Sequence, residues 1–158
     1  MIKLNLGCDT FKIEGFINID LCPDVNPDKI CDVSKLPYSD NSIDEIYCGH
    51  ILEHFACNNL PLKEWKRVLK PKAKITITVP DVERGLEQFR KGLIDYPTLN
   101  SIVFGSPIRN EQLHLSSWTS DILQIEIAKI FGNCKLLGHT KYAPYNVGWQ
   151  TICEAYKE

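Results

Sequence analysis

Short apolar blocks and amphipathic blocks alternate along this chain, and they predict strands and helices in turn. The clearest strand pattern is 74–79, where β-branched residues alternate with polar ones. Further strand patterns occur at 3–6, 16–20, 29–33, 43–48, 134–137 and 150–156. Helical spacing of apolar residues is present at 60–69, which we expect to end before Pro71, and at 82–93.

The order of these elements predicts the fold class. Strands that alternate with helices are typical of an α/β domain whose sheet is mainly parallel. The link between the first two strands, residues 8–15, is too short for the dozen or more residues that a parallel crossover normally takes. We therefore expect a Rossmann-like, mostly parallel sheet in which the first crossover helix is shortened or missing.

One more helix is predicted near the end of the chain. Thr119 can cap its N-terminus, Trp118 and Leu123 can form a hydrophobic staple, and Gly132 can close its C-terminus. Apolar residues occupy much of its circumference, which predicts a well-buried helix. The segment 95–117 before it contains Pro97, and we expect it to be irregular, as a lid or a binding segment.

Two residues at the start of the chain indicate a ligand. Gly7 follows the first strand, and Asp20 ends the second. In open α/β sheets ligands bind outside the carboxyl ends of the strands, where a glycine lets the backbone approach closely. A carboxylate at the end of the second strand can accept hydrogen bonds from ribose hydroxyls. The pair predicts a nucleoside-containing cofactor, although Asp20 could instead bond loop amides.

Composition and net charge limit the classes of partner that we expect this chain to bind. The chain has 158 residues, a net charge of −2 and no block of like charge, which favours one domain over 1–158 and disfavours nucleic acid or an anionic membrane as partner. No apolar run is long enough to cross a bilayer. The 7 cysteines include no C-x-x-C pair, and no signal peptide precedes the first strand, so we expect reduced, mostly buried thiols and a cytoplasmic protein.

Five segments in order then resemble one family. They are Leu4–Cys8, Gly15–Leu21, Asp32–Pro37, His50–His54 and Glu64–Pro71. Together they resemble the class I S-adenosylmethionine-dependent methyltransferases, and most closely the small predicted methyltransferases of the type 11-like subgroup. His114, followed by Ser117-Trp118-Thr119 and a helix, is also similar to that subgroup. The resemblance covers about residues 1–135 and implies a single methyltransferase-like domain with an antiparallel strand at the edge of the sheet.

The resemblance also implies roles for individual residues. Gly7 would lie against the methionine part of S-adenosylmethionine, Asp20 would bind the ribose hydroxyls, and Asp32 would accept from the adenine amino group. The implied cofactor-binding set is Leu6, Gly7, Cys8, Asp20, Leu21, Asp32, Val33, Cys48 and Gly49. The segment from Cys48 to His50 would face the sulfonium and the substrate.

Two departures from the family pattern stand out. The family usually has a second glycine after the first strand where this chain has Asp9, which tolerates positive φ less well and adds negative charge near the amino acid moiety of the cofactor. The family's K-P-G-G turn is Lys70-Pro71-Lys72-Ala73 here, remote from the expected cofactor site.

Methyl transfer needs a base only when the acceptor carries a proton. His50 and His114 are the candidate catalytic residues, although His50 could instead cap a helix and His114 could be a solvated loop residue. The acceptor pocket is expected from Tyr47–His54 and 82–117, whose mixed composition, with Phe89, Tyr96, Phe104, Arg84 and Arg109, suits a small molecule better than nucleic acid. The chain could also form an oligomer.

Two other functions remain open. The motif His50-Ile51-Leu52-Glu53-His54 spells H-x-x-E-H, which in zinc peptidases binds metal from one helix. Here it directly follows a strand, and Pro61 comes soon after, so we expect no metal and no zinc hydrolase. A protein that binds S-adenosylmethionine or an adenine nucleotide without catalysis is the stronger alternative, whereas a nicotinamide dehydrogenase is disfavoured because G-x-G-x-x-G is absent.

Overall fold

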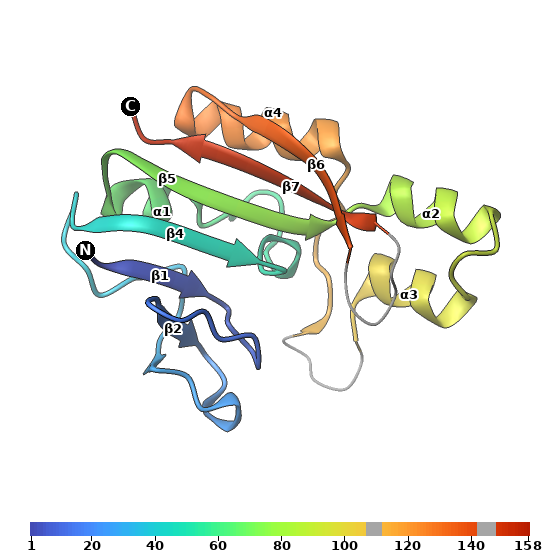
Figure 1. The fold of residues 1–158 in the computed structure, drawn as a ribbon, viewed down its shortest axis with the longest axis horizontal. Helices are drawn as coiled ribbons and strands as arrows, with labels where there is room; N and C mark the ends of the chain where they lie inside the picture. Colours follow the sequence, from blue (N-terminus) through green and yellow to red (C-terminus); the bar gives the residue numbers. More distant parts are fainter. Residues whose placement is uncertain (107–111, 142–147) are drawn as a thin grey trace.

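The computed structural model describes residues 1–106, 112–141 and 148–158, with the side chains of 140 and 141 left aside. Within them one 7-stranded sheet has the order β3-β2-β1-β4-β5-β7-β6 (Figure 1). The strands are β1 Lys3–Leu6, β2 Ile17–Asp20, β3 Lys29–Ile30, β4 Ile43–Gly49, β5 Leu69–Pro80, β6 Lys135–Lys141 and β7 Gly148–Tyr156. The first five are parallel, and β7 is antiparallel to both β5 and β6. The expected α/β fold is confirmed.

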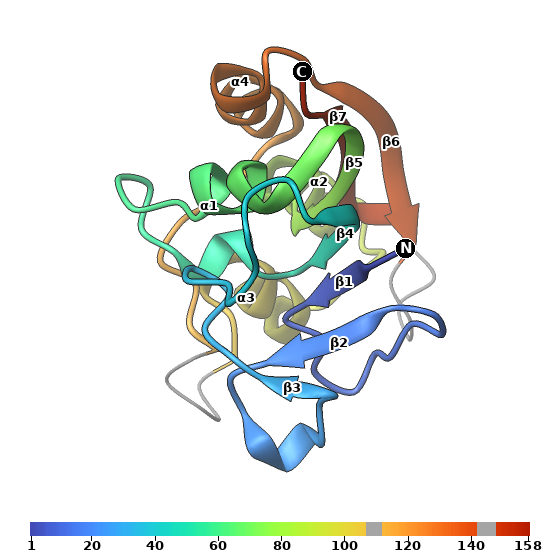
Figure 2. The same cartoon turned by 90° about the vertical axis from the view of Figure 1, so that its left-hand side faces the viewer.

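The helices form two groups, one on a face of the sheet and one beyond the end of β5. The α-helices are α1 Leu62–Val68, α2 Val82–Arg90, α3 Tyr96–Phe104 and α4 Ser120–Phe131, and short 3-10 helices span η1 Pro23–Val25 and η2 Leu52–His54. Figure 2 shows α1 and α4 on the same face of the sheet. Figure 1 shows α2 and α3 beyond the carboxyl end of β5. Strands β1 and β2 pair with each other in parallel. The link between them, residues 7–16, contains no α-helix, as expected.

The alternation of side chains explains why one crossover helix is dispensable. Leu4, Ile46 and Ile75 face α1 and α4 in the main core. The opposite face carries an ion-pair ladder across four strands: Lys3 Nζ lies 2.7 Å from Glu45, which lies 3.5 Å from Lys74 Nζ, and that ammonium lies 3.1 Å from Glu154. Because that face bears charge, it needs no helix to bury it.

Three expectations about individual elements were wrong, two about where an element lies and one about burial. Residues 96–104 form α3 rather than an irregular segment, because Asp95 caps the helix by accepting from Thr98 N and Pro97 occupies its first turn. Strand β5 begins at Leu69, with Lys72 at φ 65°, and the extra residues bulge out of the pairing with β4. Helix α4 is less buried than expected, since Ile122 and Ile125 are 46% and 55% exposed. Tyr142, expected in the final loop, lies outside the described residues.

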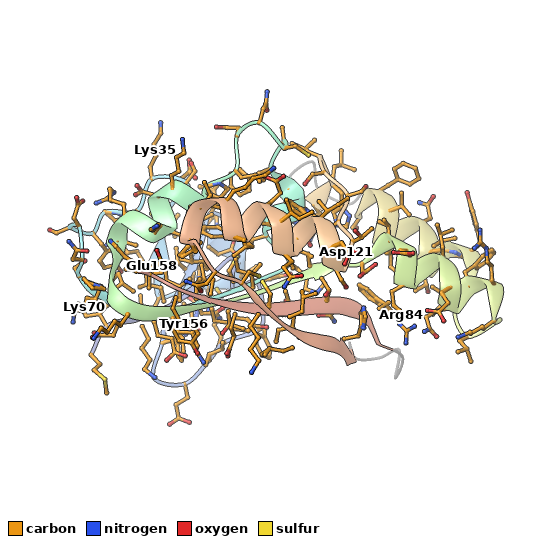
Figure 3. The ribbon with its side chains drawn as sticks, turned by 90° about the horizontal axis from the view of Figure 1, so that it is seen from above. Lys35, Lys70, Arg84, Asp121, Tyr156 and Glu158 are labelled. Atoms are coloured by element: carbon orange, nitrogen blue, oxygen red, sulfur yellow. The ribbon has the colours of Figure 1, made fainter. Side chains whose placement is uncertain are left out.

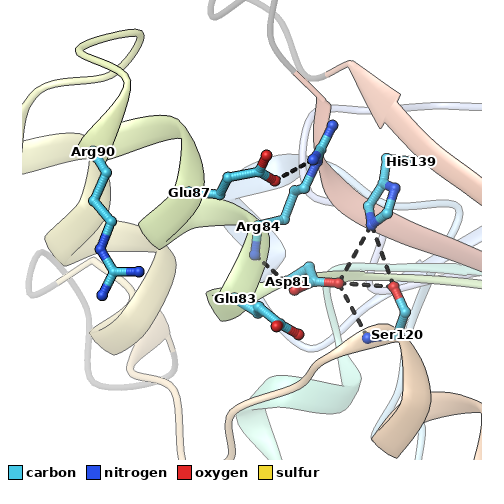
Figure 4. Close-up of a pocket in the computed structure, with 7 residues that line it drawn as sticks. All are labelled: Asp81, Glu83, Arg84, Glu87, Arg90, Ser120 and His139. Atoms are coloured by element: carbon cyan, nitrogen blue, oxygen red, sulfur yellow. Dashed lines mark hydrogen bonds and ion pairs between the residues drawn. The ribbon is translucent and has the colours of Figure 1, made fainter.

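A buried carboxylate joins two helices to the sheet. Asp81 Oδ1 accepts from Arg84 N at 3.0 Å, and Oδ2 accepts from Ser120 N at 3.1 Å and Ser120 Oγ at 2.8 Å (Figure 4). One side chain thus satisfies free N–H groups at the start of both α2 and α4. His139 Nε2 lies 3.5 Å from the same carboxylate. Asp81, Ser120 and His139 line a small pocket, and the capping of the two helices explains why these polar side chains meet there. Figure 3 shows α4 lying along the sheet, with Arg84 on α2 near the end of the molecule.

A second polar network ties the loop before β4 to α1. Glu64 accepts from Leu36 N at 2.8 Å and from Arg67 Nε and Nη2, both at 2.7 Å, and Arg67 also donates to Tyr38 O. The hydrogen bonds from Arg67 hold the pKa of Glu64 below its ordinary 4.5. A carboxyl whose pKa is lowered on folding contributes stability above its ordinary pKa and loses it as the pH falls.

We expect Glu64→Gln to lower the free energy of unfolding by about 1–2 kcal/mol at pH 7, because the charged hydrogen bonds are partly exposed. The difference should shrink as the pH falls below 4.5, the ordinary glutamate value. Urea unfolding at pH 7 and pH 3 measures it. Glu126→Gln, which removes a surface partner of Lys129, should change stability by less than about 0.5 kcal/mol. A Glu64→Gln difference that persists at pH 3 would contradict this assignment.

Candidate functional site

A large cleft opens at the carboxyl ends of the parallel strands. Its volume is about 1420 Å³. Its floor comes from the ends of β1, β2, β4 and β5, and its far wall from residues around Gly105 and His114 together with Trp149 on β7. Pockets for single small molecules usually measure roughly 300–1,000 Å³, so this cleft has room for two molecules side by side.

The turn after β1 brings the first predicted residues together. Gly7 has φ 63°, and Asp9 follows at φ 40°, so aspartate does adopt the left-handed region in place of the usual second glycine. Asp9 N donates to Asp20 Oδ2 at 2.8 Å, and Cys22 N donates to Oδ1 at 2.9 Å. Asp20 thus bonds loop amides, which is the alternative role considered above. Each carboxylate oxygen can still accept a second hydrogen bond on the cleft side.

Asp32 stands beside this turn, after the short strand β3. Its Oδ1 accepts from Ser34 N at 2.8 Å and from Ser34 Oγ at 2.7 Å, which lowers the pKa of the carboxyl. Among the described residues Oδ2 has no hydrogen-bond partner, so it can accept one from a ligand. Trp65 Nε1 on α1 donates to Val33 O at 3.0 Å and holds this part of the cleft wall in place.

The predicted cofactor residues divide into two groups. Leu6 and Cys48 are fully buried in the core and do not line the cleft, so any contact with a ligand there would be through the main chain. Burial also raises the pKa of the Cys48 thiol. The others all line the cleft: Gly7, Cys8, Asp20, Leu21, Asp32, Val33 and Gly49.

His50 lies where β4 leaves the sheet. It has φ 57°, unusual for a residue other than glycine, and its N–H donates to Thr78 O on β5 at 2.9 Å. Its Nδ1 lies 3.3 Å from Glu53 Oε1, and its ring packs edge-on against Trp149. Burial lowers the pKa of His50, but the hydrogen bond and charge of Glu53, with a hydrogen bond to Gln150, outweigh it and raise the pKa overall.

The H-x-x-E-H segment does not form the helix that a zinc peptidase requires. His50 is left-handed, and η2 comprises Leu52–His54 alone. Two histidines four apart share a face in a continuous α-helix, which is not formed here. The described geometry therefore lacks the basis for the zinc-peptidase interpretation.

A different set of side chains does meet. Glu53, His54 and His114 can each offer one donor atom such that all three lie within 4.8 Å of one another. The rings of His54 and His114 are 5.2 Å apart between centroids. Main-chain bonds hold the two segments together, because Leu115 N and Ser116 N donate to Glu53 O at 2.7 and 3.1 Å. The sequence pointed to each of these three residues, but it did not predict that their side chains lie close together.

The expected acceptor wall is only partly formed as predicted. From the 82–117 segment, Ser101, Gly105, Ser106, Gln112 and His114 line the cleft. Phe89, Tyr96 and Phe104 are exposed and line it nowhere, Arg84 lies in the pocket of Figure 4, and Arg109 falls outside the described residues. Sequence reasoning missed Phe11 and Trp149, both of which line the cleft. The available signal for Phe11 was its place in the short loop that follows the turn at Gly7.

Comparisons with known proteins agree with the resemblance. A family model described as a methyltransferase domain matches residues 18–77. No curated protein matches the chain at a significant level. None of the helices in the described part of the chain is long and apolar enough to span a membrane.

Solved structures share the fold at low sequence identity. A methyltransferase described as S-adenosylmethionine-dependent, from Methanosarcina mazei, aligns with TM-score 0.67 and 18% identity, covering 98% of this chain and 91% of that one. A possible histamine N-methyltransferase from Thermotoga maritima aligns with TM-score 0.67 and 15% identity, covering 99% and 82%. The 1,6-didemethyltoxoflavin-N1-methyltransferase of Burkholderia thailandensis, solved with its substrate and S-adenosylhomocysteine, aligns with TM-score 0.63 and 13% identity, covering 99% and 70%.

Proposed function

We propose that this chain, which has the fold of the class I S-adenosylmethionine-dependent methyltransferases and matches the methyltransferase-domain model over residues 18–77, transfers a methyl group from S-adenosylmethionine to a small acceptor. The observation that carries the proposal is the position of Asp20. Its carboxylate ends β2 at the floor of the cleft, one strand away from the Gly7 turn. That is the place where ligands of open α/β sheets bind.

The residues present fit the cofactor. Asp20 retains acceptor capacity for two ribose hydroxyls, and Asp32 Oδ2 can accept from the adenine amino group. Leu21 is an exposed apolar side chain on the cleft wall, suited to cover a flat base. Gly7 and Gly49 let the backbone approach the amino acid part. The cleft volume of about 1420 Å³ leaves space for an acceptor next to the cofactor.

When bound, the cofactor supplies the electrophilic methyl group. The chain's part is to hold the acceptor in line with that methyl and to exclude water. His50 and His114 both line the acceptor side of the cleft. Burial lowers the pKa of His114 more than the charge of Glu53 raises it, so this imidazole is neutral near pH 7 and able to accept a proton. Without a bound metal ion, His114 is therefore the residue that can act as the base for a protonated acceptor.

Asp9 stands where the family usually has a second glycine, and its replacement tests whether this difference affects cofactor binding. Its carboxylate is exposed at the cleft while its backbone holds positive φ, a conformation that glycine adopts at no steric cost. We expect Asp9→Gly to keep or tighten the affinity for S-adenosylmethionine, measured by calorimetry. A clear loss of affinity would instead show that the Asp9 carboxylate pairs with the cofactor's ammonium group.

Turnover distinguishes an enzyme from a non-catalytic binder. The protein is incubated with methyl-labelled S-adenosylmethionine and a panel of small alcohols, phenols and amines, with RNA as a macromolecular control. S-adenosylhomocysteine formation is followed. Transfer to at least one small acceptor and none to RNA is the expected result. Tight cofactor binding without transfer to any acceptor would favour the non-catalytic binding protein.

A further inference from the structure

We propose that Glu53, His54 and His114 form a binding site for a divalent transition-metal ion on the acceptor side of the cleft. All three side chains line the cleft, and each can offer a donor atom within 4.8 Å of the others. Two imidazoles and one carboxylate form a common ligand set for Zn²⁺ and for other first-row ions, with further positions left open for water or substrate.

Both histidines have one ring nitrogen already engaged. The Nδ1 of His54 lies 3.0 Å from Leu113 O, and the Nδ1 of His114 lies 3.1 Å from Ile102 O. A carbonyl oxygen only accepts, so each Nδ1 carries the proton and each Nε2 keeps a free lone pair. A backbone carbonyl that orients a histidine in this way is the usual outer partner of a metal ligand. The two rings are therefore held in the tautomer that can bind a metal through Nε2.

The carboxylate of Glu53 is the second, independent observation. Its side chain is 1% exposed, and Oε1 forms an ion pair with His50 Nδ1 at 3.3 Å. Oε2 has no hydrogen-bond partner among the described residues. A buried carboxylate that is not fully hydrogen-bonded is costly. A divalent cation would supply the partner that Oε2 lacks.

Ion binding calls for a modest rearrangement of the side chains. Donor atoms bound to a tetrahedral ion at about 2.1 Å lie about 3.4 Å apart, so donors that now lie within 4.8 Å of one another must approach by at most about 1.4 Å. The backbone around the ligands is held by the bonds from Leu115 N and Ser116 N to Glu53 O, at 2.7 and 3.1 Å. The segment after η2 and the segment around His114 are thus tied together before any ion binds.

This inference departs from the expectation of no metal. That expectation concerned His50, Glu53 and His54 on one helix, which the fold does not form. The set proposed here omits His50 and takes its third ligand from the far wall of the cleft. With an ion bound, His114 would coordinate it through Nε2 and could not act as the base, and the ion would instead lower the pKa of the acceptor, whose proton is released to water.

The site also indicates a class of acceptor, an inference that rests on the proposed function. An ion with open positions beside the methyl donor would bind an acceptor hydroxyl and lower its pKa. The hydroxyl proton leaves to water, and an oxygen lone pair forms the bond to the methyl carbon. The carbon–sulfur bond breaks, with its electrons going to sulfur, which yields a methyl ether and S-adenosylhomocysteine. We therefore infer an alcohol, phenol or vicinal diol as acceptor.

The test is metal binding by the intact chain after removal of metal with a chelator. Zn²⁺ and Co²⁺ are titrated by calorimetry, Co²⁺ also by its visible absorption, and Mg²⁺ serves as the hard-cation comparison. We expect one Zn²⁺ or Co²⁺ per chain and at least tenfold weaker Mg²⁺ binding. Glu53→Gln and His114→Gln should each weaken Zn²⁺ binding at least tenfold. His139→Gln removes the histidine outside the cleft and should leave Zn²⁺ binding unchanged.

The outcomes separate this inference from the proposed function. Absence of Zn²⁺ and Co²⁺ binding by the wild-type chain, or unchanged binding in folded Glu53→Gln, would overturn the metal site even if S-adenosylmethionine binds. If Glu53→Gln does not fold, His54→Gln decides in the same way. One bound Zn²⁺ without any S-adenosylmethionine binding would support the site and overturn the proposed methyl transfer. Methylation of amines alone, unaffected by chelator, would overturn the hydroxyl acceptor.

Discussion

Replacement of Asp20 by alanine is expected to weaken the binding of S-adenosylmethionine about tenfold to a hundredfold. Hydrogen bonds from ribose hydroxyls to a carboxylate are charge-assisted and contribute roughly 1.5–3 kcal/mol, and about 1.4 kcal/mol corresponds to a factor of ten in affinity. The carboxylate also fixes the main chain on both sides of the cleft floor, through Asp9 N and Cys22 N. Loss of this support adds to the effect.

Calorimetry on folded protein measures the change, and Asp28→Ala is the matched control. Asp28 Oδ2 likewise accepts from a backbone amide, Asn18 N at 2.8 Å, but the residue does not line the cleft. Its replacement should leave the affinity within about twofold, a change too small to indicate a lost contact. An Asp20→Ala protein that is folded and binds S-adenosylmethionine as tightly as the wild type would remove the ribose assignment.

Replacement of Gly7 by alanine should lower both stability and cofactor affinity. The residue has φ 63°, and an added Cβ would lie 1.8 Å from Ile51 Cδ1. A left-handed alanine costs about 1–2 kcal/mol, and overpacking adds about 1–3 kcal/mol. We expect a loss of roughly 2–5 kcal/mol in the free energy of unfolding, measured by urea denaturation. Ile51 itself lines the cleft, so its displacement should also obstruct the ligand.

Gly92→Ala isolates the backbone part of this effect. Gly92 has φ 70° with nothing within 4 Å of an added Cβ, so its replacement should cost the conformational term alone, about 1–2 kcal/mol, and should leave cofactor affinity unchanged. Equal losses of stability and unchanged affinity in both variants would show that the contact between Gly7 and Ile51 is unimportant.

Much of the sheet could be predicted because its strands are short apolar segments with clear ends. Pairing of β1 with β2 without a crossover helix followed from the length of the link between them, which is a limit of chain geometry and independent of packing. Helix α4 was also predicted, since Thr119 caps it by accepting from Ile122 N and Gly132 ends it in the left-handed region. Helix caps of this kind are formed by residues within about one helical turn of each other, so they can be recognised in the sequence.

Other elements depended on tertiary contacts. Pro97 was interpreted as a breaker, but a proline in the first turn removes no helical hydrogen bond, and α3 follows it. Strand β5 extends back to Leu69 because Ile43 of β4 pairs with that residue, and the main chain of Lys157 bonds to Lys72 N and Ala73 O around the bulge. Neither cause is visible in a local window of sequence.

In the candidate site, too, some features follow from local sequence signals and others depend on tertiary contacts. The turn glycine and the two strand-end acids could be predicted because parallel strands bring their carboxyl ends to one edge. The meeting of Glu53 with His114 could not, because it depends on main-chain bonds between η2 and the segment that follows α3. The inward direction of Leu6 and Cys48 follows from alternation along β1 and β4, which could have been applied to the implied cofactor set.

Titration of the wild-type chain with S-adenosylmethionine and with S-adenosylhomocysteine, followed by calorimetry, tests the central claim most directly. The account predicts that each ligand binds one-to-one and that the two compete for the same cleft. A folded protein that binds neither ligand would contradict the assignment of this cleft to the cofactor, and with it the proposed methyl transfer.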